Sequence, residues 1–179
     1  MIKQHHLLIL FLSFMFFHCS DPIAPRPKAA ASNPEEHTAQ IKDQFIRANQ
    51  QLLQKESEAM DYYAKTHKLP FVSTNTGIRY YVYKASEKGD SIRAGMQITM
   101  GYEVSLLDGT KCYSSRSDGL KTFIVAQEDA ESGIHKGVQY LKRGDKAILL
   151  IPSSLAHGLL GDFKKIPPQM PIVYDLHIY

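Results

Sequence analysis

The chain has 179 residues, of which 44% are apolar and 22% are charged, and its formal net charge is +3 at pH 7. This length allows one domain with a sizeable core and an additional segment, and the composition is ordinary for a globular protein. So small a positive charge argues against nucleic acid as a partner. Two cysteines and eight scattered histidines give no zinc signature, so we expect no metal and no cofactor.

Residues 1–18 are typical of an export signal. A basic start with Lys3 precedes Leu7–Phe17, an almost unbroken apolar run. As a helix this run would span about 16 Å, which suits a signal peptide better than a transmembrane helix. Cys19 follows, and the segment resembles a bacterial lipoprotein signal in which this cysteine carries the lipid, although His18 replaces the preferred small residue. Ordinary secretion, with Cys19 incidental, is the alternative.

Residues 19–32 are predicted to be a flexible tether, because proline and alanine are frequent and no apolar period is present. A long helix is predicted within 33–68, from about 34 to 66, with Asn33 as N-cap and Pro34 at the first helical position. Its apolar residues recur mostly at steps of three and four: Ile41, Phe45, Ala48, Leu52, Ala59, Met60 and Tyr63. Two interpretations remain open, a helix folded onto its own domain and an arm that forms a homodimer.

Residues 77–179 alternate between apolar and polar positions and are predicted to form a second region. The longest alternation places Met96, Ile98, Met100, Tyr102, Val104 and Leu106 on one face of a strand. Asp108-Gly109 then predicts a hairpin turn. Shorter strands are predicted at 78–82, 110–113, 122–125, 146–151 and 172–178, with a short helix at 132–140. The expected fold is α+β, an antiparallel half-barrel sheet of about five strands wrapped on one short helix, preceded by the long N-terminal helix.

Two apolar-proline segments bracket a loop near the C-terminus. Ile151-Pro152 leads into Leu155-Ala156-His157-Gly158, and Ile166-Pro167-Pro168 follows eight residues later. A loop held in this way can hang over the mouth of a half-open sheet. We therefore expect residues 158–165 to wall an apolar pocket.

Several short segments recur in a fixed order across residues 77–179: Gly101-Tyr102, Leu107-Asp108-Gly109-Thr110, Ser114-Ser115-Arg116, Gly133 and Gly137-Val138, Lys142 to Ala147, Ile151-Pro152, Leu155 to Gly158, Ile166-Pro167-Pro168 and Tyr174-Asp175-Leu176. In this order, and nearly in this spacing, they resemble the FKBP-type peptidyl-prolyl cis-trans isomerases. The resemblance implies an isomerase (rotamase) that needs no cofactor and acts on proline-containing polypeptides. Its role would be to assist the folding of exported envelope proteins by rotating X-Pro bonds.

The signal, tether, helix and the opening Gly77-Ile78-Arg79-Tyr80-Tyr81 together resemble the FKBP-like lipoproteins of Bacteroidetes. One subgroup of these is associated with gliding motility. This layout implies a protein of the cell envelope with a lipid anchor in a bacterial membrane, the expected location being the outer membrane facing the periplasm.

The resemblance also implies which residues form the site. The catalytic positions would be Tyr102, Tyr113, His157 and Ile166, and the substrate-binding positions Cys112, Phe123, Ile134 and Tyr174. Ile166 falls where a backbone N–H and a side chain meet the ligand. Several positions depart from the family pattern: Cys112-Tyr113 replaces Phe-Asp, Ile134 replaces tryptophan, His157 replaces tyrosine, and Ala130-Glu131 replaces an apolar pair.

These departures leave two functions open. The first is an active isomerase. The second is a weakly active or inactive FKBP-like chaperone or scaffold, within the gliding machinery if the narrower resemblance holds. A hydrolase built on Ser114, Ser115, His135 and His157 is disfavoured, because no Gly-x-Ser-x-Gly elbow is present.

Overall fold

The computed structural model describes residues 34–127 and 130–179. The predicted signal, the tether and Cys19 lie outside the described residues. Residues 41–179 form one compact unit, and the contacts described below lie within it. None of the helices in the described ranges combines the length and apolarity needed to cross a membrane.

Helix α1 (Pro34–His67) is the predicted long helix, and its bounds agree with the expected 34–66 to within one residue. Glu35 and Glu36 lie in its first turn and Lys65 and His67 in its last, which complements the helix dipole. The helix ends where Lys68 takes a left-handed φ of 53°.

Seven strands form one antiparallel sheet within the described residues, in the order β1-β2-β6-β7-β3-β4, with β5 also paired to β3. They are β1 (Val72–Ser73), β2 (Arg79–Lys84), β3 (Gln97–Leu106), β4 (Lys111–Ser114), β5 (Lys121–Ile124), β6 (Lys146–Ile151) and β7 (Ile172–Ile178). The α+β class is confirmed, and the sheet has more strands than the five expected. The predicted segments 110–113 and 122–125 form β4 and β5, which pair with different halves of β3, and the two-residue β1 is the strand that was not predicted.

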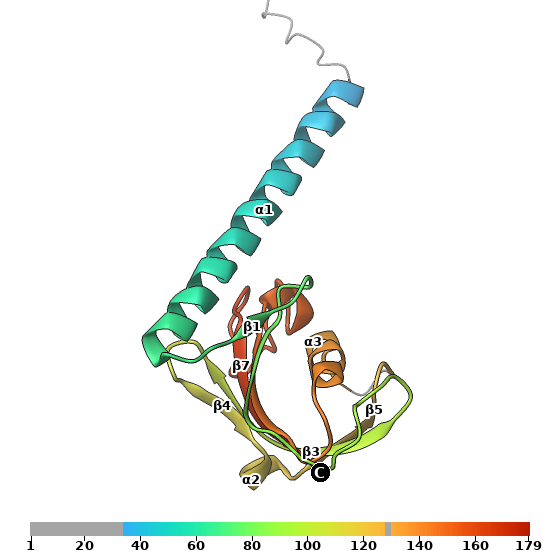
Figure 1. Ribbon diagram of the computed structural model, residues 1–179. Helices are drawn as coiled ribbons and strands as arrows, with labels where there is room; N and C mark the ends of the chain where they lie inside the picture. Colours follow the sequence, from blue (N-terminus) through green and yellow to red (C-terminus); the bar gives the residue numbers. More distant parts are fainter. Residues whose placement is uncertain (1–33, 128–129) are drawn as a thin grey trace, which may run out of the picture. The chain divides into compact units, whose positions relative to one another are not determined.

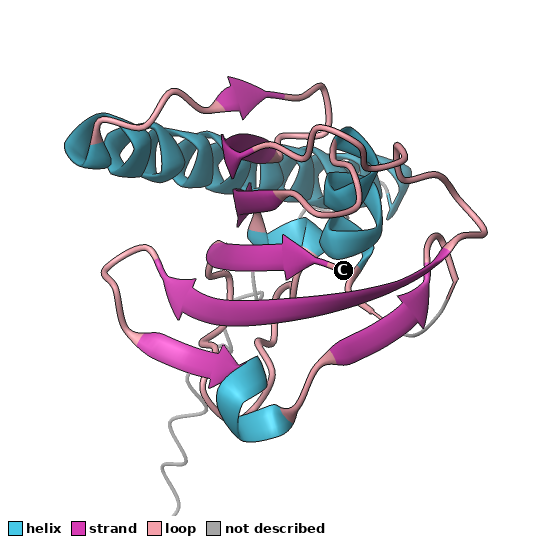
Figure 2. Ribbon diagram, turned by 60° about the horizontal axis from the view of Figure 1, so that its bottom comes forward, coloured by secondary structure: helices cyan, strands magenta, loops and turns pink. Residues whose placement is uncertain are grey.

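The long strand β3 organises the sheet (Figure 2). Its predicted alternation is observed, since Ile98, Met100, Val104 and Leu106 are buried. The hairpin to β4 turns at Gly109, where φ is 89° and the Asp108 carboxylate accepts a hydrogen bond from the N–H of Thr110. After β4, a one-turn helix that the sequence did not predict, α2 (Ser115–Asp118), carries the chain to β5.

The sheet curves around α3 (Ser132–Gly137), which continues as the 3-10 helix η1 (Val138–Tyr140) (Figure 1). Two glycines allow this close packing: a Cβ on Gly133 would lie 2.3 Å from Ile151 Cγ2, and one on Gly137 would lie 2.6 Å from Leu149 Cδ1. The main core fills the space between helix and sheet. The helix therefore supports the concave face of the sheet on which the candidate site is built.

The C-terminal part of α1 packs on the sheet. Met60 is buried with Leu150 of β6 and Val173 of β7. The buried Glu56 carboxylate accepts hydrogen bonds from the N–H and hydroxyl of Ser153, in the short helix η2 (Ser153–Leu155). This part of α1 is thus folded onto its own domain, while earlier apolar residues remain exposed: Ile41, Phe45, Ile46 and Leu53.

Candidate functional site

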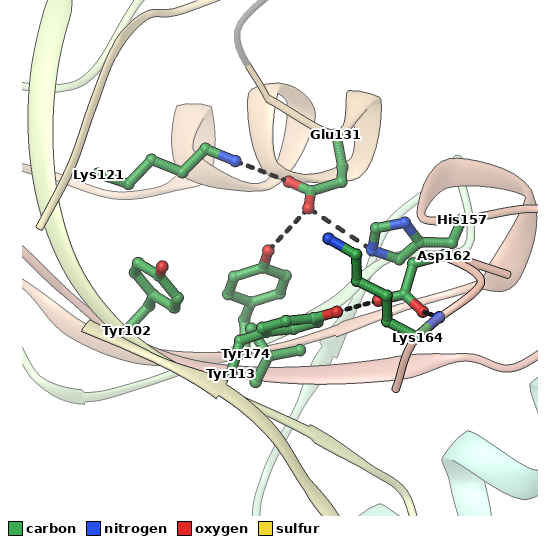
Figure 3. A pocket seen from close by; sticks show the side chains of 9 residues that line it. Tyr102, Tyr113, Lys121, Glu131, His157, Asp162, Lys164 and Tyr174 are labelled. Atoms are coloured by element: carbon green, nitrogen blue, oxygen red, sulfur yellow. Dashed lines mark hydrogen bonds and ion pairs between the residues drawn. The ribbon is translucent and has the colours of Figure 1, made fainter. Parts of the chain in front are cut away.

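A cavity of about 280 Å³ opens on the concave face of the sheet, beside the start of α3 and the loop after η2 (Figure 3). The sheet supplies Tyr102 and Val104 from β3, Tyr113 from β4, Lys121 from β5 and Tyr174 from β7. The remaining lining residues come from loops: Glu131, His157, Asp162 and Lys164. The lining is thus mixed aromatic and charged, whereas an apolar cleft was expected.

Glu131 is the centre of a polar network in this pocket. Its carboxylate accepts hydrogen bonds from Lys121 Nζ at 3.3 Å and from the hydroxyl of Tyr174 at 3.1 Å. His157 Nε2 lies 3.6 Å from the same carboxylate. Burial by itself raises the pKa of Glu131, but its own backbone N–H, Lys121 and Tyr174 outweigh burial and hold the pKa below its usual range. The carboxylate is therefore ionised at neutral pH.

Asp162 is a second carboxylate hub, in the loop that walls the pocket. Its Oδ1 accepts hydrogen bonds from the backbone N–H groups of Lys164 at 2.9 Å, Lys165 at 2.9 Å and Ile166 at 2.8 Å. Its Oδ2 accepts a hydrogen bond from the hydroxyl of Tyr113. Burial alone would raise the pKa of Asp162, but these four donors hold it below its usual range. The hydrogen bond between Tyr113 and Asp162 also raises the pKa of Tyr113 to about 12. Asp162 thus fixes both the loop and the Tyr113 side chain.

The three pocket tyrosines differ in the state of their hydroxyl groups. The Tyr113 hydroxyl donates a hydrogen bond to Asp162, and the Tyr174 hydroxyl donates one to Glu131. The hydroxyl of Tyr102 has no hydrogen-bond partner among the described residues, while its backbone N–H donates to Ser115 Oγ at 3.0 Å. Burial, followed by the charges of Asp118 and Glu131, raises the pKa of Tyr102, so this group remains a neutral donor. Tyr102 is the pocket tyrosine free to bind a ligand.

The eight predicted site residues separate into two groups. Four line the pocket together: Tyr102, Tyr113, His157 and Tyr174. The other four are buried in the main core and line no part of the pocket surface: Cys112, Phe123, Ile134 and Ile166. The N–H of Ile166, which the resemblance directs to a ligand, donates to Asp162 in this structure. Cys19, the predicted lipidation site, lies outside the described residues.

Sequence reasoning assigned no role to Lys121, Glu131, Asp162 or Lys164. Glu131 was recognised only as a departure from an apolar pair. For Asp162 a local signal was available, because an aspartate in a loop favours an Asx turn, in which the side chain accepts hydrogen bonds from following N–H groups. For Lys121 no local signal existed, since its role depends on the place of β5 in the sheet.

The residues of the disfavoured hydrolase do not form a nucleophilic site. Ser114 Oγ accepts the N–H of Arg116, and Ser115 Oγ accepts the N–H of Tyr102. His135 Nδ1 accepts the N–H of Ala126. Over the described residues, no group of three or more histidine, cysteine or carboxylate side chains is arranged to hold a metal ion.

An open antiparallel sheet wrapped on one short helix, with an aromatic pocket on its concave side, defines the fold class of this protein. The model of the FKBP-type peptidyl-prolyl cis-trans isomerase family matches residues 88–179. That match covers more than half of the chain. The chain belongs to this family.

Two FkpA proteins illustrate the similarity. An FKBP-type peptidyl-prolyl cis-trans isomerase FkpA of Buchnera aphidicola is 30% identical over 105 residues, which cover 59% of this chain and 41% of the relative. FkpA of Escherichia coli K12 is 29% identical over 124 residues, 69% of this chain and 45% of the relative. The chain thus spans less than half of the length of these relatives. The crystal structure of E. coli FkpA superposes with a TM-score of 0.60 at 25% identity, covering 83% of this chain and 72% of that one.

Proposed function

We propose that the protein is a peptidyl-prolyl cis-trans isomerase whose substrate proline enters the pocket between Tyr102 and Tyr174. The observation that carries this proposal is the free hydroxyl of Tyr102 in a pocket of about 280 Å³ within the family's fold. Family membership supports proline-containing polypeptides as the substrate class. No nucleophile, metal or cofactor is needed for this reaction.

The barrier to rotation about a peptide bond, about 18–20 kcal/mol, comes from amide resonance. An isomerase must bind the twisted amide better than either planar form. The twisted amide has lost charge separation, so a ring-lined pocket that excludes water favours it. Tyr102 and Tyr174, with ring centres 6.2 Å apart and inclined by 51°, form such walls, and the main core supports both rings.

Hydrogen-bond donors then hold the substrate while the amide twists. The hydroxyl of Tyr102 is available for a substrate carbonyl. His157 can donate from a ring nitrogen at the position where the family has a tyrosine, and its side chain lies within 3.6 Å of Glu131. In this proposal Tyr113 acts through Asp162 by holding the pocket wall, rather than by direct contact with substrate.

The test is a measurement of cis-trans exchange in a short X-Pro peptide by NMR or by a protease-coupled assay. Catalysed exchange is expected, with a reduced rate for Tyr102→Ala. Tyr62→Ser, at an exposed position on α1, is the control and should leave the rate unchanged. A rate equal to the uncatalysed one would sink the enzyme proposal.

A second candidate is a weakly active or inactive chaperone or scaffold. The ionised Glu131 and its partner Lys121 favour it, because charged groups in the pocket oppose the burial of an apolar proline ring. Binding of an unfolded proline-rich protein without catalysed exchange would support this candidate over the first.

We further propose that the protein is exported and anchored through Cys19 to a bacterial membrane, at the outer membrane facing the periplasm, with exported envelope proteins as clients. The residues 1–18 and the tether support this placement. The narrower resemblance to gliding-associated lipoproteins makes the gliding machinery a candidate partner. Metabolic labelling with a lipid precursor should mark the wild type and spare Cys19→Ala; an unlabelled wild type would refute the anchor.

A further inference from the structure

The loop that walls the pocket exposes three large apolar side chains, none of which lines the pocket. Leu159, Leu160 and Phe163 are 62%, 65% and 82% exposed. They fall within five consecutive residues, while the buried Ile166 lies just beyond them. Such a concentration of apolar surface on a short loop is typical of a contact surface rather than of scattered exposure.

The same residues border a second cavity. A groove of about 370 Å³ is lined by Leu160, Phe163 and the segment 164–168, which carries Ile166, Pro167 and Pro168. No acidic side chain lines it, and Lys164 and Lys165 supply its charge. A groove with this lining suits an apolar side chain and disfavours a basic one.

The loop backbone is held in place without any occupant. Three consecutive N–H groups donate to Asp162, and the N–H of Asp162 donates back to the carbonyl of Ile166 at 3.1 Å. The N–H of Gln169 closes the base of the loop on the carbonyl of Gly158 at 3.0 Å. Gly161 permits this fold, since a Cβ there would lie 2.2 Å from the carbonyl oxygen of Ile166. Phe163 is held at a left-handed φ of 58°. A preorganised apolar surface loses little entropy on binding.

Groove and pocket share a wall. Lys164 lines both cavities. Asp162 lines the pocket, and its carboxylate holds the backbone of residues 164–166, which line the groove. A polypeptide whose proline occupies the pocket therefore reaches the groove by continuing over Lys164. Because the two cavities share Lys164, the groove is best explained as a site for the same polypeptide that occupies the pocket.

We propose that the groove between Leu160, Phe163 and Ile166 is an extended substrate site, which binds an apolar side chain of the same polypeptide whose proline lies in the pocket. The proposal rests on the isomerase function proposed above and narrows its substrates to proline segments with an apolar residue at one defined spacing. Short peptides fill the pocket only. Longer chains fill both cavities.

The test compares two sets of peptides on the full chain carrying Cys19→Ala, so that no lipid anchor interferes. The first set is a short X-Pro peptide alone. The second set consists of longer peptides of polar residues around one proline, in which a single leucine is moved stepwise along both sides of that proline. One leucine position should raise kcat/KM by about tenfold, because a buried apolar side chain supplies binding energy of that order. Lysine at the same position should remove the gain.

Phe163→Ser and Leu160→Ser should abolish the leucine gain and leave the short peptide unaffected. Tyr62→Ser, an aromatic position on α1 whose exposure lies between those of Leu160 and Phe163, is the matched control and should change neither. Equal rates for all leucine positions, or a gain that survives both loop variants, would overturn the proposal. Flotation of the chain with anionic phosphatidylglycerol vesicles, lost in Phe163→Ser and without any leucine gain, would assign the loop to a membrane surface instead.

The groove proposal and the isomerase proposal can be refuted separately. If no peptide is isomerised above the uncatalysed rate, the proposed function fails. The groove is then tested by fluorescence anisotropy of labelled peptides, in which tighter binding of the leucine peptide that depends on Phe163 still supports it. Equal binding of all peptides contradicts it.

Discussion

Tyr102, Tyr113 and Tyr174 show how one side-chain type takes different roles within a single pocket. Each lies on a strand of the same sheet, yet two hydroxyls are committed to carboxylates and one is free. These hydrogen bonds limit what each tyrosine can do, since a hydroxyl that donates to Asp162 or Glu131 must break that bond before it can bind substrate. Tyr102 is therefore the residue on which a substrate hydrogen bond is most directly tested.

Tyr102→Phe is expected to lower kcat/KM for an X-Pro peptide by about 2- to 12-fold, the range that corresponds to the loss of one hydrogen bond. The ring and its packing remain, so the free energy of unfolding should change little. Tyr83→Phe is the matched control, because the Tyr83 hydroxyl donates to Asp175 and lines no part of this pocket. Equal activity of wild type and Tyr102→Phe would show that this hydroxyl does not contact the substrate.

Among the elements, the loop from His157 to Ile166 depends on one carboxylate. Asp162 collects three backbone N–H groups and the Tyr113 hydroxyl, so its charge is what organises the loop. The donors lower its pKa in the folded state below the value of about 3.9 in an unfolded chain. The contribution of Asp162 to stability is thus complete above that unfolded value and is lost as the pH falls through the folded pKa.

Asp162→Asn should lower the free energy of unfolding at pH 7 by about 1–2 kcal/mol, since charge-assisted hydrogen bonds are replaced by weaker neutral ones. Between about pH 5 and pH 2 the wild type should lose stability more steeply than the variant, so that the two converge. Urea unfolding followed by circular dichroism at several pH values measures this. Parallel curves for the two proteins would contradict the role of Asp162.

Helix α1 is tied to the site region through polar contacts as well as packing. The buried Glu56 accepts both the N–H and the hydroxyl of Ser153, at the start of η2, from which the chain continues to His157. The buried Arg79 side chain of β2 donates to Asp61 and Ser57 of α1. These contacts specify the position of the helix more closely than the apolar contacts of Met60 do.

Glu56→Ala should destabilise the fold by about 1–3 kcal/mol, because it leaves two buried donors of Ser153 without an acceptor. Glu58→Ala is the control on the same helix, since the Glu58 side chain is exposed and accepts only from Gln54. Thermal or urea unfolding of both variants gives the comparison. A loss for Glu58→Ala as large as that for Glu56→Ala would show that removing a charge from the helix, and not breaking the buried contact, is responsible.

At the scale of the whole molecule, the described residues leave a set of apolar side chains of α1 largely exposed. Ile41, Phe45, Ile46 and Leu53 are between 40% and 70% exposed. Their recurrence on one side of the helix is the pattern of a surface that pairs with a second helix. We therefore propose a homodimer formed through α1, in which a second copy covers these side chains.

Sedimentation of the full chain with Cys19→Ala should give a dimer, and the additional change Phe45→Ser should shift it towards the monomer. Adding Tyr62→Ser instead should have no effect, because Tyr62 lies about 100° around the helix from Phe45. Isomerase activity on a short peptide should be unchanged in all three proteins, since the pocket is complete within one chain. A monomer before any helix change would exclude the homodimer.

Much of the fold could be read from the residues because its signals are local. The alternation of Ile98, Met100 and Val104 sets the buried face of β3, and Asp108-Gly109 sets the hairpin. The helix at 34–67 has an equally local pattern. The one-turn α2 and the two-residue β1 were not predicted, because segments so short have no period to detect.

The sequence by itself determined the α+β class, the family and which side chains face the concave side of the sheet, because a strand of period two assigns its faces without reference to any other part of the chain. Only the tertiary structure decided which polar groups meet. Glu131 and Tyr174 are 43 residues apart and Tyr113 and Asp162 are 49 apart, and each pair forms where the curvature of the sheet brings separate elements together. Those two contacts determine which tyrosine is free to act, and no local pattern encodes them.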